Sequence, residues 1–170
     1  MIGQLIDGKY EIVRLIGQGG MGAVYEAVVR EGDSAGDDER RVAVKLINDE
    51  EVAQDEVLLA RFAREAQAAA KVRSPHIVEM LGSGHDEKSG LPYMVMELLD
   101  GQNAQQLLER LGPLPPELAV PLGVQTCIGL AEAHGVGVVH RDIKPANLFL
   151  AEGPSGELTV KLLDFGVAKF

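Results

Sequence analysis

The sequence predicts an α+β fold in which an antiparallel sheet precedes a mainly helical half. Strand-like alternation of polar and apolar residues dominates residues 1–98, with one helical stretch, whereas helical spacing dominates residues 99–170, with one small hairpin. A chain of 170 residues with 46% hydrophobic and 25% charged side chains has an ordinary globular composition, and it can bury a core without disulfides. We therefore expect two lobes, residues 1–98 and residues 99–170, with the boundary near residues 97–101.

Five antiparallel strands are expected in the first lobe. Residues 10–16 alternate between polar and apolar side chains, and residues 23–30 and 41–47 are rich in β-branched side chains. Two further apolar segments, residues 76–81 and 91–98, complete the sheet and are separated by a turn-rich stretch.

One helix is expected in the first lobe and two in the second. Residues 49–72 have apolar side chains at steps of three and four, which is typical of an amphipathic helix. The second lobe should contain two helices and then a hairpin, at residues 102–111, 115–134 and 147–163. Pro121 should kink the second of these helices or delay its start, because proline lacks the amide donor.

Charge and cysteine content exclude several classes of protein. The chain has 26 acidic and 16 basic side chains, a net charge of −10, so its surface repels phosphate backbones and anionic lipids, and we expect no nucleic-acid partner. Cys127 is the sole cysteine in the sequence, which excludes an internal disulfide and a cysteine-built zinc site. No apolar run approaches the roughly 20 residues that span a bilayer, and no leader precedes the first strand, so we expect a cytoplasmic chain without a membrane segment.

The glycine cluster at residues 17–22 has two interpretations. Gly17, Gly19 and Gly22 follow a strand, and their backbone amides could approach phosphate oxygens closely. A tight hairpin turn without a ligand explains the same residues. A dinucleotide-binding turn is disfavoured, because a strand follows in place of a helix and Val42 stands where such a site needs an acid. The flanking strands favour a glycine-rich flap.

Lys45 and Glu65 are charged residues in apolar surroundings. Lys45 shares a strand face with Ala43, so both could line one cleft, although an edge lysine that points to water is the commoner case. Glu65 falls on the apolar face of the predicted helix, beside Phe62 and Ala69, where a carboxylate needs a cation. A pair between Lys45 and Glu65 would serve positioning better than stability, because burying both charges is costly.

Chemically active side chains are densest in the loop at residues 140–147. The loop follows an apolar segment, and its polar residues are His140, Arg141, Asp142, Lys144 and Asn147. Asp164 ends a later apolar strand. Asn147 and Asp164 offer the hard oxygen ligands that suit Mg²⁺ bound to nucleotide phosphates, whereas Asp142 could accept a proton.

In this combination and order, the motifs resemble those of the eukaryotic-type (Hanks-type) protein kinases, most closely the bacterial serine/threonine protein kinases. The matching segments are the glycine flap, the strand with Lys45, the helix with Glu65, the loop at residues 140–147 and Asp164-Phe165-Gly166. The resemblance implies a protein kinase-like fold, with an antiparallel five-stranded N-lobe that carries one helix and a truncated, mainly helical C-lobe. The order Asp142-Ile143-Lys144 resembles the serine/threonine kinases and differs from the tyrosine kinases.

The resemblance implies catalytic roles for four residues. Asp142 would orient and deprotonate the hydroxyl of a serine or threonine in a protein substrate, and Lys144 would neutralise charge on the transferred phosphoryl group. Lys45 would bind the α- and β-phosphates of ATP and pair with Glu65. The implied reaction is transfer of the γ-phosphate of ATP to that hydroxyl.

A nucleotide and metal site is also implied by the resemblance, with ATP and Mg²⁺ as cofactors. Asn147 and Asp164 would hold the metal, and the flap would cover the phosphates. Apolar side chains from both lobes would enclose adenine, and the backbone after the fifth strand would contact its edge. The residues implied in nucleotide binding are Ile16, Gly17, Gln18, Gly19, Gly20, Met21, Gly22, Ala23, Val24, Ala43, Lys45, Met96, Glu97, Leu99 and Phe149.

The chain departs from the family pattern at its end. It stops at Phe170, four residues after Gly166, where the family continues with an activation segment and further helices. We therefore expect the helix at residues 115–134 to expose an apolar face, which favours self-association. The alternative to an active kinase is a catalytically incomplete nucleotide-binding or interaction module with the same fold.

Overall fold

The computed structural model describes residues 1–19, 22–30, 40–47 and 70–164. Two compact units divide the chain. The first comprises residues 1–66 and 80–98, and the second comprises residues 67–79 and 99–170. The predicted helix at residues 49–72, which carries Glu65, lies almost entirely outside the described residues. The α+β fold class is confirmed by the strands of the first unit and the helices of the second.

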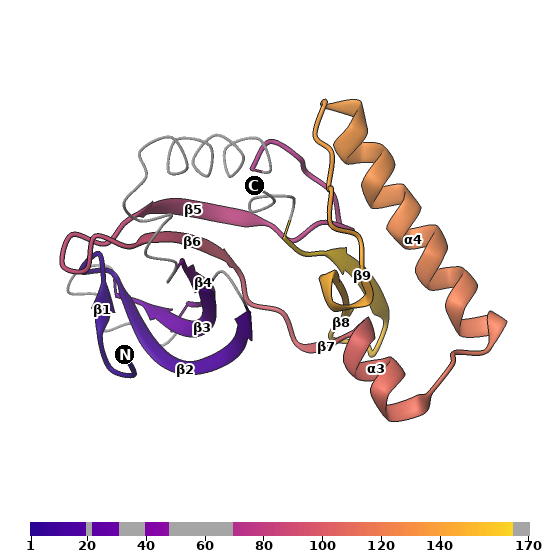
Figure 1. The fold of residues 1–170 in the computed structure, drawn as a ribbon, viewed down its shortest axis with the longest axis horizontal. Helices are drawn as coiled ribbons and strands as arrows, with labels where there is room; N and C mark the ends of the chain where they lie inside the picture. The colour runs from indigo at the N-terminus through magenta and orange to yellow at the C-terminus, as the bar shows by residue number, and fades with distance from the viewer. Residues whose placement is uncertain (20–21, 31–39, 48–69, 165–170) are drawn as a thin grey trace. The chain divides into compact units, whose positions relative to one another are not determined.

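A six-stranded antiparallel sheet forms the first unit (Figure 1). Its strands are β1 (Leu5–Ile6), β2 (Tyr10–Gly19), β3 (Gly22–Val29), β4 (Arg41–Leu46), β5 (Met80–His85) and β6 (Pro92–Glu97). They lie in the order β1-β2-β3-β4-β6-β5. The sheet thus contains one more strand than the five expected, because β1 has two residues, too few for alternation to reveal.

The prediction for the fourth strand was wrong. Residues 76–81 were expected to form it, but β5 begins at Met80, and Ile77 instead forms a parallel bridge with Leu162 in the second unit. β5 itself contains two glycines, which read as turn residues in the sequence. Gly84 has a packing reason: a Cβ there would lie 2.7 Å from the hydroxyl oxygen of Tyr93 on β6.

The apolar core of the first unit lies on one face of the sheet. Ile12, Val44, Leu46 and Val95 come from three strands, β2, β4 and β6, and are almost fully buried. The register places Val44 directly opposite both Tyr25 and Val95. Burial of each such aliphatic side chain contributes roughly 1.5–3 kcal/mol, so this face fixes the strands whose opposite face carries Lys45.

A buried carboxylate links the turns that follow the two edge strands of this sheet. Asp86, which is 3% exposed, accepts hydrogen bonds from the Asp7 amide (2.9 Å) and from the amide (2.9 Å) and hydroxyl (2.6 Å) of Ser89. Asp7 in turn accepts a hydrogen bond from the Tyr93 hydroxyl (2.7 Å). Burial raises the pKa of the Asp86 carboxyl, but these hydrogen bonds outweigh it and hold that pKa below its ordinary value. Since β1 and β5 occupy opposite edges, the network requires the sheet to curl.

Replacing Asp86 with Asn is expected to lower the free energy of unfolding by about 1–3 kcal/mol, because an amide cannot accept hydrogen bonds on both of its terminal atoms. Thermal unfolding at neutral pH measures the loss, and Glu87→Gln, an exposed neighbouring change, is the control. The wild type should lose this stabilisation as the pH falls below the ordinary Asp value near 3.8, because the folded-state pKa is the lower one. An unchanged unfolding midpoint in Asp86→Asn would contradict the role of this network.

The second unit begins with a small sheet and a capped helix. Its strands are β7 (Gly101–Asn103), β8 (Leu148–Glu152) and β9 (Leu158–Leu162), in the order β7-β8-β9. The helix α3 (Ala104–Leu111) starts two residues later than predicted, because residues 101–103 pair with β8. The Asn103 side chain accepts a hydrogen bond from the Gln106 amide, and the Gln106 side chain accepts one from the Asn103 amide, which completes a capping box.

The long helix α4 (Pro116–Gly135) packs against β9 and the segment before β5. It starts one residue after the predicted position and continues through Pro121, so the expected late start is not observed. Ala133 is buried with Val72, Ile77 and Leu162 in one apolar cluster. This cluster anchors the end of β9, after which Asp164 follows.

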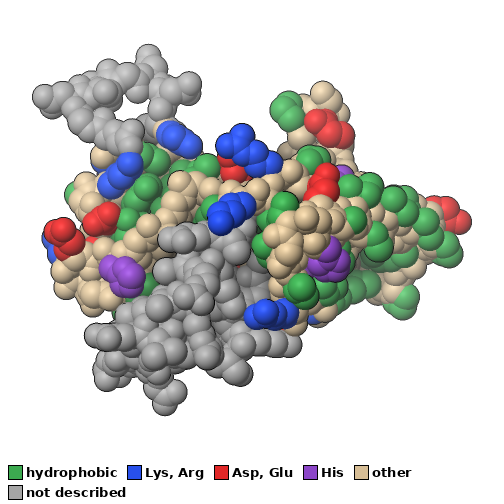
Figure 2. All heavy atoms as spheres, turned by 90° about the horizontal axis from the view of Figure 1, so that it is seen from above, with side chains coloured by type: hydrophobic (Ala, Val, Ile, Leu, Met, Phe, Trp, Pro, Cys, Tyr) green, Lys and Arg blue, Asp and Glu red, His purple; other side chains and the backbone are tan. Residues whose placement is uncertain are grey.

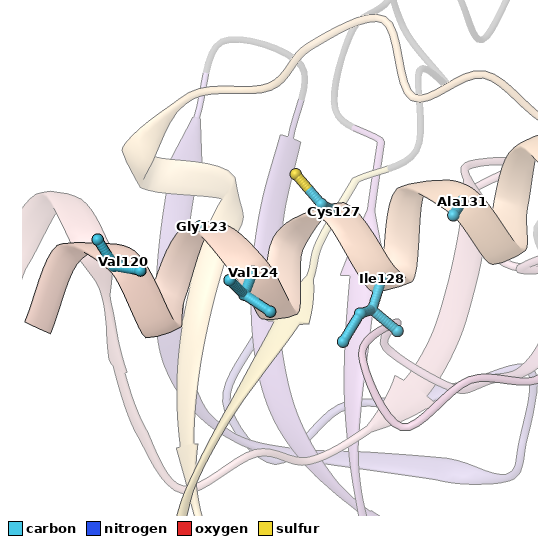
Figure 3. Close-up of a pocket in the computed structure, with 6 residues that line it drawn as sticks. All are labelled: Val120, Gly123, Val124, Cys127, Ile128 and Ala131. Carbon is cyan, nitrogen blue, oxygen red and sulfur yellow. The ribbon is translucent and has the colours of Figure 1, made fainter.

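The opposite side of α4 exposes apolar residues, as expected from the sequence. Val120 is 61% exposed and Val124 is 53% exposed, and hydrophobic side chains gather at the right of Figure 2. An open groove runs along this face (Figure 3), lined by Val120, Gly123, Val124, Cys127, Ile128 and Ala131. Self-association through this face stays a prediction. No helix among the described residues is both long and apolar enough to cross a membrane.

Candidate active site

His140 is the buried centre of the polar loop that follows α4. It is 1% exposed, and its Nε2 lies 2.7 Å from the carbonyl oxygen of Leu163, whereas its Nδ1 accepts a hydrogen bond from the Asp142 amide at 3.3 Å. Since a carbonyl can only accept and an amide can only donate, both contacts require the neutral tautomer with its proton on Nε2. Burial lowers the pKa of His140, although the Leu163 carbonyl and the nearby carboxylates oppose the shift. The neutral ring therefore ties the Asp142 backbone to the residue before Asp164.

The Asp142 carboxylate is held by two side chains of its own loop. Its Oδ2 lies 2.8 Å from Nζ of Lys144 and accepts a hydrogen bond from Nδ2 of Asn147 at 3.1 Å. The same Asn147 nitrogen also donates to the Asp142 carbonyl oxygen at 2.8 Å. The 3₁₀ turn Pro145–Asn147 brings Asn147 back toward Asp142. Because the Asp142 side chain is 25% exposed, the oriented carboxylate is accessible from solvent and can accept a hydrogen bond or a proton.

Asn147 and Asp164 are brought near each other by a backbone hydrogen bond. The amide of Leu163 donates to the carbonyl oxygen of Asn147 at 2.9 Å, and Asp164 is the next residue. Arg141 and Asp164 both have left-handed backbone, with φ of 65° and 50°. This conformation is uncommon for residues other than glycine and concentrates at functional sites.

The donor set fits Mg²⁺ held jointly with a phosphate ligand. The Asn147 amide nitrogen is bonded to Asp142, so the side-chain oxygen is the atom that can ligate a metal. Asp164 supplies a carboxylate in the adjacent segment. Among the described residues, no three His, Cys, Asp or Glu side chains gather into a metal-binding cluster. Mg²⁺ commonly takes one or two protein oxygens and completes its shell with water and substrate phosphates.

Four sequence-predicted residues share one face of the sheet in the first unit. Val24 on β3 lies opposite Lys45 on β4, and Ala43 on β4 lies opposite Met96 on β6. Because alternate residues of a strand point to the same face, these side chains lie on the side of the sheet opposite the apolar core. Ala43 and Met96 are buried, whereas Lys45 and Val24 are half-buried.

The glycine cluster lies at the β2–β3 hairpin. Ile16, Gly17, Gln18 and Gly19 end β2, and Gly22, Ala23 and Val24 begin β3. A Cβ on Gly22 would collide with the Leu46 carbonyl group, so glycine is required there by the close approach of β4. Gly20 and Met21 lie outside the described residues, as does Glu65.

The remaining predicted residues are divided between the units. Glu97 ends β6 in the first unit, whereas Leu99 belongs to the second. Phe149 lies on β8, between β7 and β9, where it pairs with Asn103 and Lys161.

Sequence reasoning missed an acidic residue on the face that carries Ala43. Glu26 of β3 is 2% exposed and lies directly opposite Ala43. The available signal was an acid within an otherwise apolar strand, which is the same reasoning that singled out Glu65.

Comparison with known proteins assigns the family. A model of the protein kinase domain matches residues 10–170. The chain is 36% identical over 169 residues to a probable serine/threonine-protein kinase of Clostridium perfringens, and 38% identical over 171 residues to the serine/threonine-protein kinase PknA of Mycobacterium tuberculosis. Each match covers 99% of this chain.

A crystal structure of the Mycobacterium tuberculosis PknI kinase domain matches with a TM-score of 0.77 and 32% identity. The match covers 99% of this chain and 64% of that domain. The chain spans 23% and 37% of the length of the Clostridium perfringens protein and of PknA. With a domain match over nearly its whole length, the chain belongs to the protein kinase family, and its relatives are bacterial serine/threonine protein kinases.

Proposed function

We propose that this chain carries the nucleotide-binding and phosphoryl-transfer residues of an ATP-dependent serine/threonine protein kinase. The observation that supports this most directly is the Asp142 carboxylate, oriented by Lys144 and Asn147 and tied through His140 to the residue before Asp164. The proposed lobes are residues 1–98 and 99–170.

In the proposed reaction, Asp142 performs the proton transfer. Its carboxylate accepts the proton of a serine or threonine hydroxyl as that oxygen attacks the γ-phosphorus of ATP. The bond from the γ-phosphorus to the bridging oxygen breaks, and ADP leaves with that electron pair. Lys144, which is 2.8 Å from Asp142, neutralises charge on the transferred group. Its pairing with the carboxylate also holds both side chains in place before substrate arrives.

The proposed metal ligands and the sheet face that carries Lys45 would bind ATP and neutralise the charge of its phosphates. Asn147 and Asp164 are the proposed Mg²⁺ ligands, and bound Mg²⁺ neutralises phosphate charge. On the sheet, Lys45 is the proposed partner of the α- and β-phosphates, and Val24 and Ala43 are proposed to contact adenine. Their shared face is consistent with a single ligand surface.

A second candidate function is nucleotide or protein binding without phosphoryl transfer. The exposed apolar face of α4 favours it, because a large apolar surface on a folded unit is typical of a docking site for another protein segment.

Incubation with Mg²⁺, γ-labelled ATP and a generic basic protein is expected to give labelled serine or threonine, detected after acid hydrolysis. Thermal unfolding with and without MgATP distinguishes the candidates. Transfer supports the kinase, whereas stabilisation by MgATP without transfer supports the binding module. A chain that neither transfers the label nor gains stability would contradict the kinase and the nucleotide-binding form of the second candidate.

A further inference from the structure

A buried carboxylate flanked by two arginines lies on the sheet face that carries Ala43 and Lys45. Oε2 of Glu26 lies 2.6 Å from Arg14 on β2, and its Oε1 accepts a hydrogen bond from Arg41 on β4 at 2.7 Å. The Glu26 side chain is 2% exposed, whereas the two arginines are 63% and 55% exposed. One carboxylate thus joins three adjacent strands.

We propose that Glu26 and Arg14 form a positioning pair that fixes the glycine-bearing end of β2 against β3, and thereby sets the affinity for MgATP. This inference rests on the proposed function, because it assigns a role in nucleotide binding. Neither residue is proposed to touch the nucleotide.

The location of Glu26 argues against a role in stability alone. Burying the Glu26 carboxylate costs several kcal/mol in desolvation, which attraction to the two arginines, both more than half exposed, only offsets. An apolar side chain would fill the same site on β3 without that cost, as Val24 and Val28 do two residues away on either side. Glu26 lies opposite Ala43. The buried carboxylate is therefore on the same sheet face as the residues proposed to contact adenine.

The pairing of β2 with β3 is irregular at the point where Arg14 reaches Glu26. Register shifts occur between Ile12 and Arg14 and again between Leu15 and Gly17. Between these shifts, two residue pairs remain, Arg14 with Glu26 and Leu15 with Tyr25. A bulge locally disrupts the hydrogen-bond ladder and bends its strand. The ladder alone therefore holds this stretch weakly, and Ile16 and Gly17 follow directly.

Arg41 contacts the same carboxylate from a strand whose register needs no such support. β3 and β4 pair through six consecutive residue pairs, from Ala23 with Leu46 to Val28 with Arg41, without a shift. Arg41 and Arg14 thus have the same partner, nearly the same distance to it and similar exposure. They differ in the strand on which each one lies: the pairing of β2 with β3 is irregular around Arg14, whereas the pairing of β4 with β3 has no register shift.

This difference provides a matched pair of variants. Arg14→Met and Arg41→Met each remove one cation, keep an apolar stem and leave Glu26 with one arginine. We expect similar decreases in the urea midpoint for both. Calorimetric titration with MgATP should show roughly five- to tenfold weaker binding for Arg14→Met, because a small displacement of the end of β2 would misplace the residues that bind the nucleotide. For Arg41→Met the affinity should change by less than about twofold. Arg14→Lys should recover most of the affinity.

Hydrogen exchange without nucleotide gives a second readout that does not depend on ATP binding. Amides of residues 15–19 should exchange faster in Arg14→Met than in the wild type, and should not change in Arg41→Met. Equal losses of affinity in the two variants, or unchanged affinity and exchange in Arg14→Met, would overturn the positioning role. A wild-type chain that does not bind MgATP refutes the proposed function and the affinity effect, and the exchange comparison then decides whether the pair fixes β2.

Discussion

Asp142→Asn is expected to reduce phosphoryl transfer by roughly 10²–10⁴-fold, because general-base assistance is typically worth that much. The amide retains the size of the carboxylate, and its oxygen can still accept hydrogen bonds from Lys144 and Asn147. The bond from Asn147 to the Asp142 carbonyl oxygen is to the backbone and is unaffected. The loop should therefore remain folded, and the affinity for MgATP should change by less than about twofold, because Asp142 is not a proposed metal ligand.

Transfer of γ-labelled phosphate to the basic protein measures the rate, and calorimetric titration measures MgATP affinity. Asp100→Asn, an exposed acid of the same unit outside the polar loop, removes the same charge and should retain wild-type transfer. If Asp142→Asn transfers phosphate at more than about a tenth of the wild-type rate, Asp142 is not the base.

Gly129→Val is expected to lower the free energy of unfolding by about 3 kcal/mol, at the upper end of typical overpacking costs. A Cβ at Gly129 would lie 2.9 Å from the His76 carbonyl oxygen and 3.0 Å from Leu162 Cδ1. Neither neighbour can move easily, since the His76 carbonyl accepts the Leu162 amide at 2.9 Å and Leu162 is fully buried. The helix α4 must therefore shift away from β9.

Gly123→Val is the matched control on the same helix, because a Cβ there has nothing within 4 Å. Valine is a slightly better helix former than glycine, so the unfolding midpoint should stay unchanged or rise slightly. Urea unfolding followed by circular dichroism at 222 nm reports on both variants. Similar midpoints for Gly129→Val and Gly123→Val would show that α4 does not approach residue 76 as closely as described.

The polar loop and the first three long strands could be predicted from the sequence, because their signals are local. Alternation located β2, and β-branched side chains located β3 and β4, each to within a few residues. The density of polar side chains at residues 140–147 identified the loop. The strand β5 could not be located from its two glycines, of which Gly84 packs against the Tyr93 side chain. Local spacing contains no information about that neighbour.

The part of the candidate site that needed coordinates is the set of contacts that hold each functional side chain. The sequence indicated Asp142 as a base but not that Lys144 and Asn147 orient it, nor that neutral His140 connects it to Leu163. These contacts join residues up to 23 positions apart. They depend on how β9 folds back beside the loop.

By itself, the sequence determined the family, the succession of strands and helices, and the identity of the polar residues, because each is encoded in neighbouring residues or in motifs of fixed order. The tertiary structure alone decided that Glu26 would be buried between Arg14 and Arg41. It also decided that residues 76–78 would hydrogen-bond to Leu162 at the end of β9, whereas the sequence predicted them as part of the strand observed as β5. Both outcomes depend on which strands pair with each other. Strand pairing is decided by burial of the whole core, and the sequence of any one segment contains only a small part of that information.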